Sequence, residues 1–569
     1  MAISLTYPGT ERIIIHSIFY FQRMETMETT KKRNGFASGI GFILAAAGSA
    51  IGLGNLWSFP YKTSANGGAA FVFVYILSSA IIGSIVMIAE MYLGKRAQAN
   101  PVTAYKKANK GLGWLGLFAI IIPLLITCYY SILGGYTIKY TMNSFNDNSQ
   151  ILAAFSGNVG EVILYTAIFI ILALVVVMAG VKGGIERASK VLMPALFILL
   201  VGVVIYCLTL GEGVKDGLAY YLKPDFSQLG FKGILAAMSQ AFFSLSLGMG
   251  IMVSYGSYAG KNIKIGQSVL MICVFDTLVA LLAGLAIFPA IYHYKAISGV
   301  DLKANGIMLL FSSLPIVFDN LGTIGHIVSF FFFGMVAIAA LTSVISLLEV
   351  VTQFVIQKFR VHRTKAICVV AAICFAISIP ISISLGYAIN GQDKMTICGQ
   401  NWLDFIDMVT NTVLMPVCAL GSCLAIGWFI DKKATANPLK TFKTLEEDGL
   451  LLGKFGKIFA VMVKYVTPAL ILVVEIFGVK DIIFPDNVFS KDGLGIVITA
   501  YALLALAAII YFVWLAKRET GCNADEIDIA IAANLDESDE DEEAEEPLCN
   551  ETATCREKES PENVTDTEK

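Results

Sequence analysis

The sequence predicts an all-α membrane protein with twelve transmembrane helices, and three observations support this fold class. Of the 569 residues, 56% are hydrophobic and only 15% are charged, and the mean hydropathy is +0.71. Soluble domains are roughly 45–50% apolar and about 25% charged, so the composition excludes a soluble protein. Long apolar runs recur along the chain, and Lys and Arg gather in alternate connections between them.

Twelve apolar runs are long enough to be transmembrane helices. An α-helix needs about 20 apolar residues to cross the hydrocarbon core of a bilayer. Backbone groups in lipid must be satisfied within their own segment, so each run should be helical. The runs lie near residues 38–62, 68–93, 116–140, 161–181, 188–210, 233–258, 267–291, 325–357, 365–388, 402–430, 456–477 and 494–516.

The connections between the runs predict the orientation of the chain. One alternating set of connections contains 25 Lys and Arg residues, and the other set contains 8. The positive-inside rule places the richer set in the cytoplasm. Both termini then face the cytoplasm, which requires an even number of spans. We therefore expect a multi-pass protein of the cell (plasma) membrane, with the lipid bilayer as its surroundings.

The charge distribution divides the chain into three parts. From Lys517 to Lys569 there are 19 Asp and Glu against 5 Lys and Arg, a net charge of −14, so the rest of the chain carries +11. An acidic, aromatic-free segment of this kind is typical of disorder. We predict a cytoplasmic N-terminal segment (1–36), a transmembrane domain (37–517) and an acidic disordered cytoplasmic tail (518–569).

Several classes of function find no support in the sequence. The four histidines are scattered, and no phosphate-binding loop of the type GxxxxGK[ST] occurs, so neither a metal centre nor ATP as energy source is indicated. No cluster of His, Cys or paired carboxylates suggests a membrane enzyme. The eleven cysteines show no framework spacing, and we expect no disulfide. We also expect no organic cofactor and no nucleic-acid partner.

Two of the predicted helices contain glycine and serine clusters at their centres. The first reads GFILAAAGSAIGLGNLWSFPY, and the sixth reads SQAFFSLSLGMGIMVSYGSY. Glycine costs roughly 1 kcal/mol relative to alanine inside a helix, so each helix should unwind at its cluster. Spans 1 and 6 each begin a group of five. Interrupted helices at matching positions indicate an inverted repeat with a binding site near the membrane midplane.

Unwound helices at this depth suit a small zwitterion and a small cation. Free N–H groups and positive dipole ends attract a carboxylate, and exposed carbonyls and hydroxyls offer hard oxygen ligands to a cation. The family introduced below is itself the established example of this arrangement. Small residues can also serve only to let helices pack closely. The occurrence of two such helices in register favours the binding site.

At these residues the sequence resembles the neurotransmitter:sodium symporter family, specifically its bacterial amino-acid transporters. The resemblance covers roughly residues 33–515, and its most specific stretches are GSAIGLGNLWSFPYKTSANGGAAFVFVY and SQAFFSLSLGMG. It implies a leucine-transporter-like fold, a five-plus-five inverted repeat with unwound helices 1 and 6. It also implies sodium-driven symport of a small molecule by alternating access.

The resemblance implies two sodium sites built from oxygen ligands, with Na⁺ as the coupling ion. The first would use the Ala50 carbonyl with Asn55, Ser244 and Asp276. The second would use the carbonyls of Gly48, Ile51 and Ala339 with the hydroxyls of Thr342 and Ser343.

The resemblance also implies the substrate site. The substrate carboxylate should meet the amides of Leu53 and Gly54 and the hydroxyl of Tyr130. The amine should meet carbonyls near Ala50, Phe243 and Ser246, and the side chain should face Ile126, Phe243, Ser246, Met249 and Ser343. Family members that carry amines without a carboxylate have aspartate at the position of Gly52, so this chain resembles the amino-acid branch. Met249 is flexible and apolar, which suggests a medium or large apolar side chain.

Chloride-dependent relatives hold chloride with a tyrosine, a glutamine and serines. Tyr75, Gln240 and Ser244 match these, but Ala280 replaces a serine, and the usual asparagine of the first sodium site is Asp276. An ionised Asp276 would supply the missing negative charge, which predicts chloride independence. The alternative is a protonated Asp276 packed against a polar neighbour.

The gates depart from the family pattern. At the inner gate Arg33 matches the family's arginine, Phe36 replaces its tryptophan, and Ser257 and Tyr258 match the pair on span 6. At the outer gate Asp407 matches the acidic residue, but Ser58 stands where the family has a base. Either Lys62, one helical turn on, substitutes for that base, or Asp407 is isolated in the vestibule.

One further acidic residue lies within a predicted span. Glu90 is near the end of span 2, and an ionisable group there is a functional candidate. We expect it to brace the unwound stretches rather than to bind substrate, with snorkelling toward the cytoplasm as the alternative.

We expect sodium-coupled import of a neutral, apolar amino acid. Two alternatives remain open: the same fold carrying another small zwitterion or an osmolyte, and a non-transporting amino-acid sensor.

Overall fold

The computed structural model describes residues 35–146, 151–300, 302, 306–429, 443, 450, 452, 455–485 and 488–520. By packing, the chain divides into one unit of residues 1–509 and a second of residues 510–569. Arg33 and most of the predicted N-terminal segment and acidic tail lie outside the described residues. In the second unit, residues 510–520 are helical and form the end of α24.

Ten helices in the described part of the chain are long and apolar enough to cross a membrane. Each is one helix or a chain of helices joined by a π-helical or 3₁₀ turn (η): α4–η2–α5 (Ala69–Ala97), η3–α7 (Lys110–Asn143), α9 (Val159–Met178), η4–α10 (Val181–Leu208), α14 (Ile265–Ser298), α17 (Gly322–Phe359), α18 (Arg363–Ile389), α19–η6–α20–η7 (Trp402–Phe429), α22–η8–α23 (Phe455–Ile483) and α24 (Lys491–Thr520).

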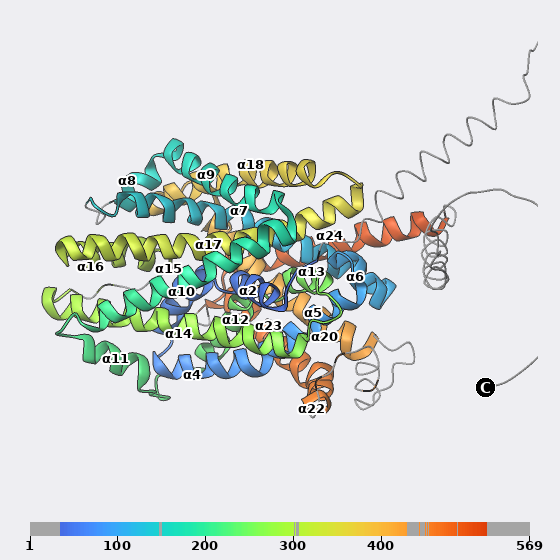
Figure 1. The fold of residues 1–569 in the computed structure, drawn as a ribbon, viewed down its shortest axis with the longest axis horizontal. Helices are drawn as coiled ribbons and strands as arrows, with labels where there is room; N and C mark the ends of the chain where they lie inside the picture. The colour runs from blue at the N-terminus through green and yellow to red at the C-terminus, as the bar shows by residue number, and fades with distance from the viewer. Residues whose placement is uncertain are drawn as a thin grey trace, which may run out of the picture. The chain divides into compact units, whose positions relative to one another are not determined.

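Two further spans are broken, and Figure 1 shows their pieces α2, α12 and α13 near the centre of the first unit. The first comprises α2 (Gly39–Ala50), the π-helical turn η1 (Gly54–Ser58) and α3 (Phe59–Ala65), with a bend of 47°. The second comprises α12 (Phe231–Ser244) and α13 (Ile251–Ser257), separated by the non-helical residues 245–250. These two broken spans and the ten continuous helices account for the twelve predicted runs.

The break in the second span has a local cause. Ser246, Gly248 and Gly250 all have positive φ, at 54°, 74° and 70°. A side chain on Gly248 would also bring its Cβ within 2.2 Å of the Met415 carbonyl oxygen. Only glycine adopts this conformation without strain in so little space, so the helix must end where the sequence predicts that it unwinds.

Short elements connect the spans. Helical connections are α6 (Pro101–Ala108), α8 (Ile151–Gly157), α11 (Val214–Leu222), α15 (Gly306–Met308), η5 (Leu309–Ser313) and α16 (Leu314–Asp319). The described strands, β1 (Thr396–Ile397) and β2 (Gln400–Asn401), form one antiparallel pair.

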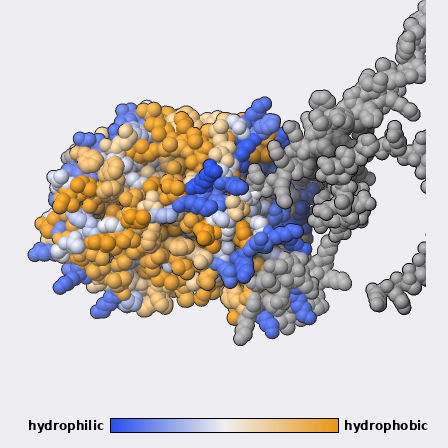
Figure 2. All heavy atoms as spheres, in the orientation of Figure 1, coloured by the Kyte–Doolittle hydropathy of each residue, from blue (hydrophilic) through white to orange (hydrophobic). Residues whose placement is uncertain are grey.

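Apolar side chains cover much of the outer surface. On the face drawn in Figure 2, hydrophobic residues fill the middle of the first unit, and hydrophilic residues gather toward its ends. Ile198 is 70% exposed and Val191 is 68% exposed, although both lie in the apolar helix α10. Such a surface is unfavourable in water and suits a protein surrounded by lipid.

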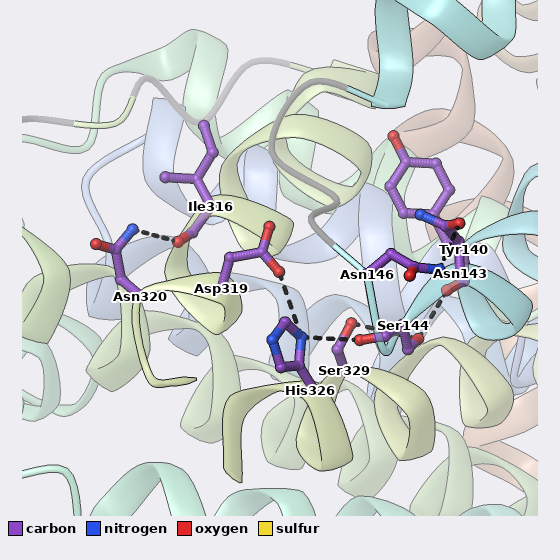
Figure 3. A network of polar contacts seen from close by, with 9 residues as sticks. All are labelled: Tyr140, Asn143, Ser144, Asn146, Ile316, Asp319, Asn320, His326 and Ser329. Carbon is purple, nitrogen blue, oxygen red and sulfur yellow. Dashed lines mark hydrogen bonds and ion pairs between the residues drawn. The ribbon is translucent and has the colours of Figure 1, made fainter. Parts of the chain in front are cut away.

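A polar corner fixes the connection before α17 (Figure 3). The Nδ1 atom of His326 lies 3.0 Å from the Ser144 carbonyl oxygen, just beyond α7, and 3.8 Å from an oxygen of Asp319 at the end of α16. Deeper in the same region, the Tyr140 hydroxyl donates to the Phe311 carbonyl at 2.6 Å. The helical segment of η5 and α16 is thereby tied to α7 and α17.

Candidate functional site

A cavity lies where the two broken spans meet α7 and α17. Together with the open space that it adjoins, it amounts to about 310 Å³ not filled by protein atoms. Of the ten residues predicted to bind substrate, nine line it: Ala50, Gly52, Gly54, Ile126, Tyr130, Phe243, Ser246, Met249 and Ser343. The tenth, Leu53, lies at the same place, because its backbone N–H donates to the Tyr130 hydroxyl at 2.6 Å.

Three residues that line the cavity were not predicted: Ser49, Ile251 and Leu347. Leu347 lies four residues after Ser343, one helical turn along α17, so this spacing was a usable signal. Ser49 stands among glycines and alanines, and nothing in its neighbourhood marks it as a wall of the cavity.

Gly52 is enclosed more tightly than Gly54, the other glycine of the cavity wall. A Cβ atom at this position would lie 2.4 Å from Ser343 Oγ and 2.5 Å from the Tyr130 hydroxyl. Real Cβ atoms do not approach neighbours so closely, so any side chain here would displace two residues of the site. The absence of a side chain at residue 52 is therefore a steric requirement of this cavity.

A cluster of oxygen atoms lies beside the cavity, at the predicted first sodium site. The Ser244 hydroxyl lies 3.0 and 2.8 Å from the two oxygens of Asp276. The Asn55 amide nitrogen lies 2.8 Å from Asp276 Oδ1, and its own oxygen accepts from the Gly52 N–H at 3.2 Å. All three polar side chains are fully buried. A carboxylate, a hydroxyl and an amide oxygen are the hard ligands that a small cation prefers.

The predicted second sodium site lies between α2 and α17. A Cβ on Gly48 would be 3.4 Å from the Thr342 side chain, so the two helices are in contact there. The Thr342 hydroxyl donates to the Ala339 carbonyl at 3.0 Å, and Ser343 Oγ donates to the Ser49 carbonyl at 3.1 Å. Ile51 caps α2 in an extended conformation with ψ of 100°. The predicted ligands thus belong to two segments that pack directly on each other.

Comparison with known proteins identifies the family. Residues 33–153 and 149–517 match the Sodium:neurotransmitter symporter family. The chain belongs to this family. It is 36% identical over 421 residues to the sodium-dependent transporter YhdH of Bacillus subtilis, covering 71% of this chain and 89% of that protein. It is 33% identical over 471 residues to a sodium-dependent transporter of Haemophilus influenzae, covering 78% and 98%.

A solved structure agrees with this assignment. The crystal structure of MhsT in complex with L-phenylalanine is 35% identical to the symporter, with a TM-score of 0.70, and the match covers 78% of this chain and all of MhsT. The predicted fold class, a leucine-transporter-like arrangement with broken first and sixth helices, is confirmed. The symporter is a sodium-dependent membrane transporter and not an enzyme.

Tyr75 and Gln240, which match chloride ligands of relatives, bond to the protein's own groups. Tyr75 donates to Asp276 Oδ2 at 3.2 Å and lies 3.1 Å from Ser244 Oγ. The Gln240 amide nitrogen donates to the Gly54 carbonyl at 2.8 Å, and its oxygen accepts from Ser58 at 2.8 Å. Tyr75 therefore faces a carboxylate, and Gln240 braces the unwound part of the first span.

Glu90 braces the other unwound stretch. Its Oε1 atom accepts from the Gly248 N–H at 2.9 Å and from the Ser422 hydroxyl at 3.3 Å. The side chain is buried on α5, and Gly248 has no helical partner for its N–H because the helix is broken there. This geometry fits the bracing role expected for Glu90 and not snorkelling toward the cytoplasm.

Two of the predicted inner-gate residues, Phe36 and Tyr258, meet at the N-terminal end of α2. Phe36 packs edge-on against Phe42 and Tyr255, with ring centroids 5.3 and 5.6 Å apart, and its N–H donates to the Tyr258 carbonyl at 3.3 Å. The Tyr258 hydroxyl donates to Glu349 at 2.7 Å. Glu349 is also ion-paired with Arg363. The Ser257 hydroxyl accepts from the Gln353 amide at 2.9 Å.

The outer-gate acid is held by polar neighbours. Asp407 Oδ1 accepts from the Tyr129 hydroxyl at 2.8 Å and from the Asn411 amide at 2.5 Å. The charge of Lys62 acts on Asp407, and so does that of Asp404. Among the described residues Asp407 is therefore not isolated, and the charge of Lys62 reaches it without a hydrogen bond or ion pair between the two side chains.

Proposed function

We propose that this symporter imports a neutral, apolar amino acid together with sodium, by alternating access, and that it does so without chloride. The observation that carries the proposal is the enclosure of Gly52 by Ser343 and Tyr130. Since no carboxylate fits at residue 52, the substrate must bring its own negative group to this end of the cavity. An amino acid does so, whereas an amine lacking a carboxylate does not.

The lining of the cavity supports an apolar side chain. Ile126, Met249, Ile251 and Leu347 face it, together with the ring of Phe243. None of the lining residues is charged, so a charged substrate side chain would lose its hydration without gaining a partner. The related MhsT was solved with L-phenylalanine, whose side chain is of this kind.

The buried cluster around Asp276 supports sodium as the co-transported ion and chloride independence. Asp276 contributes a carboxylate, and Ala280 offers no hydroxyl where chloride-dependent relatives have a serine. An anion placed beside Tyr75 and Ser244 would meet this carboxylate, and two like charges at such a distance repel strongly in a buried site. Sodium bound here would touch both Asp276 and the substrate carboxylate, which couples the two cargoes.

Uptake into liposomes tests the function. Purified protein should accumulate labelled phenylalanine or leucine only under an inward sodium gradient. Equal uptake in potassium or choline would contradict sodium coupling. Glycine betaine and an amine without a carboxylate are tested in the same assay as the competing substrates. Sodium-dependent binding of an amino acid without accumulation would indicate a sensor instead.

Replacing chloride with gluconate tests the role of Asp276. Wild-type uptake should be unchanged, because the carboxylate provides the negative charge. Asp276→Asn should lose most uptake in gluconate, and the double change Asp276→Asn with Ala280→Ser should regain it only when chloride is present. A strict chloride requirement of the wild-type protein would refute this part of the proposal.

A further inference from the structure

Ser49, at the end of the first broken helix, is held by α17 at two points. Its carbonyl oxygen accepts from Ser343 Oγ at 3.1 Å, and its hydroxyl lies 2.7 Å from Ser346 Oγ. Ser346 in turn donates to the Ser343 carbonyl at 2.6 Å. These contacts form a closed ring through three serines, all of which are buried.

The direction of the hydrogen bonds in this ring follows from the number of protons. A serine hydroxyl donates once and can accept twice. Because Ser346 donates to the Ser343 carbonyl, Ser49 must donate to Ser346. Ser346 thus joins α2 and α17 at one fully buried atom.

The ring lies beside the predicted second sodium site. Gly48 and Ile51 are the neighbours of Ser49 and Ala50 in the chain, and Ser343 is itself a predicted ligand. Fixing both the carbonyl and the hydroxyl of Ser49 fixes the orientation of the adjoining peptide groups. A cation site built from carbonyls of one segment and hydroxyls of another depends on that orientation.

We propose that Ser346 is a positioning residue for the second sodium site. Ser346 holds Ser49 so that the carbonyls of Gly48 and Ile51 face Thr342 and Ser343. The proposal rests on the sodium-coupled function proposed above. It assigns a role to a residue that supplies no ligand to the substrate or to sodium.

The experiment measures sodium-dependent binding of labelled phenylalanine to purified full-length protein. Ser346→Ala should raise the half-saturating sodium concentration about tenfold, as expected for the loss of one buried hydrogen-bonded arrangement. Phenylalanine affinity at saturating sodium should stay within about twofold of wild type, since the substrate does not touch Ser346. A merely structural role would lower thermal stability without changing the sodium dependence.

Ser378→Ala is the matched control. Ser378 is also a buried serine that donates to a carbonyl three residues earlier in its own helix, at 2.7 Å. Its variant should keep the wild-type sodium dependence. Equal sodium dependence of the two alanine variants would overturn the proposal. If the wild-type protein itself binds phenylalanine independently of sodium, the proposed function is refuted instead.

Discussion

Gly52 and its two neighbours show how a single position restricts the substrate. Ser343 and Tyr130 converge where a side chain would begin, so residue 52 can shape the cavity only by having none. Asn55, Ser244 and Asp276 lie close behind it and form the buried oxygen cluster. The substrate and its predicted coupling ion are thereby brought within a few residues of each other.

Gly52→Ala should therefore weaken amino-acid binding. The added methyl group would overlap Ser343 Oγ and the Tyr130 hydroxyl, and relieving this overlap costs about 1–3 kcal/mol, which lowers amino-acid affinity about tenfold or more. Equilibrium binding of labelled phenylalanine measures the effect. Gly39→Ala is the control, because a Cβ at Gly39 meets no atom within 4 Å. Wild-type affinity in Gly52→Ala would show that the cavity is looser than described.

Among single residues, the sequence predicted those that belong to a specific motif. It missed residues whose partners lie far away in the sequence. Nine of the ten predicted substrate residues line the cavity, and all ten were carried over from the family resemblance. Ser49 and Ser346 lie 297 residues apart, and each looks locally like a small residue in a packed helix. Only the fold reveals that their hydroxyls meet.

The broken helices depend on side chains that replace missing backbone partners. The Gly248 N–H would have no acceptor at the break, and Glu90 supplies one from a different span. The Gly54 carbonyl is bound in the same way by Gln240. Each break is therefore paired with one buried polar side chain that fixes its geometry.

Glu90→Ala should destabilise the protein and reduce uptake. It leaves the Gly248 N–H buried without an acceptor, which costs about 1–3 kcal/mol. Thermal unfolding in detergent and uptake into liposomes measure the two effects. Glu90→Gln retains an acceptor oxygen and should recover most of the stability. Ser84→Ala removes only an exposed hydrogen bond to Ala80 in the same span and should behave as wild type; equal stability of Glu90→Ala would argue against the bracing role.

The sequence located both breaks because glycine clusters mark unwinding, but it gave no indication of the π-helical turns. Several spans contain one, such as η6 (Val409–Leu414) within the span from Trp402 to Phe429. A π-helical turn shifts the hydrogen-bond register by one residue and leaves composition and hydropathy unchanged. It therefore leaves no mark on the properties from which the spans were predicted.

The arrangement of the whole molecule follows from the requirement that lipid-exposed segments satisfy their own backbone groups. Because of this requirement, the twelve apolar runs could be predicted to be helices with few alternatives. The repeat that pairs spans 1 and 6 came from the resemblance and agrees with the solved relative. The predicted orientation rests on loop charge, because one alternating set of connections has 25 Lys and Arg residues and the other set has 8.

Labelling with a membrane-impermeant thiol reagent tests the orientation. Met142 is 67% exposed near the end of α7, on the predicted outer side, and Phe359 is 64% exposed at the end of α17, on the predicted inner side. In a Cys368→Ser background, Met142→Cys should react in intact cells, and Phe359→Cys only after permeabilisation. The reverse pattern would invert the predicted topology.

The hydroxyl of Ser343 belongs to the cavity wall, to the serine ring and to the predicted second sodium site. This overlap imposes an order on the mutational paths open to the chain. Aspartate at position 52, the feature of amine carriers, does not fit unless Ser343 and Tyr130 move or are replaced by smaller residues. Yet changing Ser343 first would weaken sodium binding before any new cargo could be carried. A lineage starting from this sequence would therefore cross a poorly functioning intermediate, and a designer seeking an amine carrier should change positions 52, 130 and 343 together.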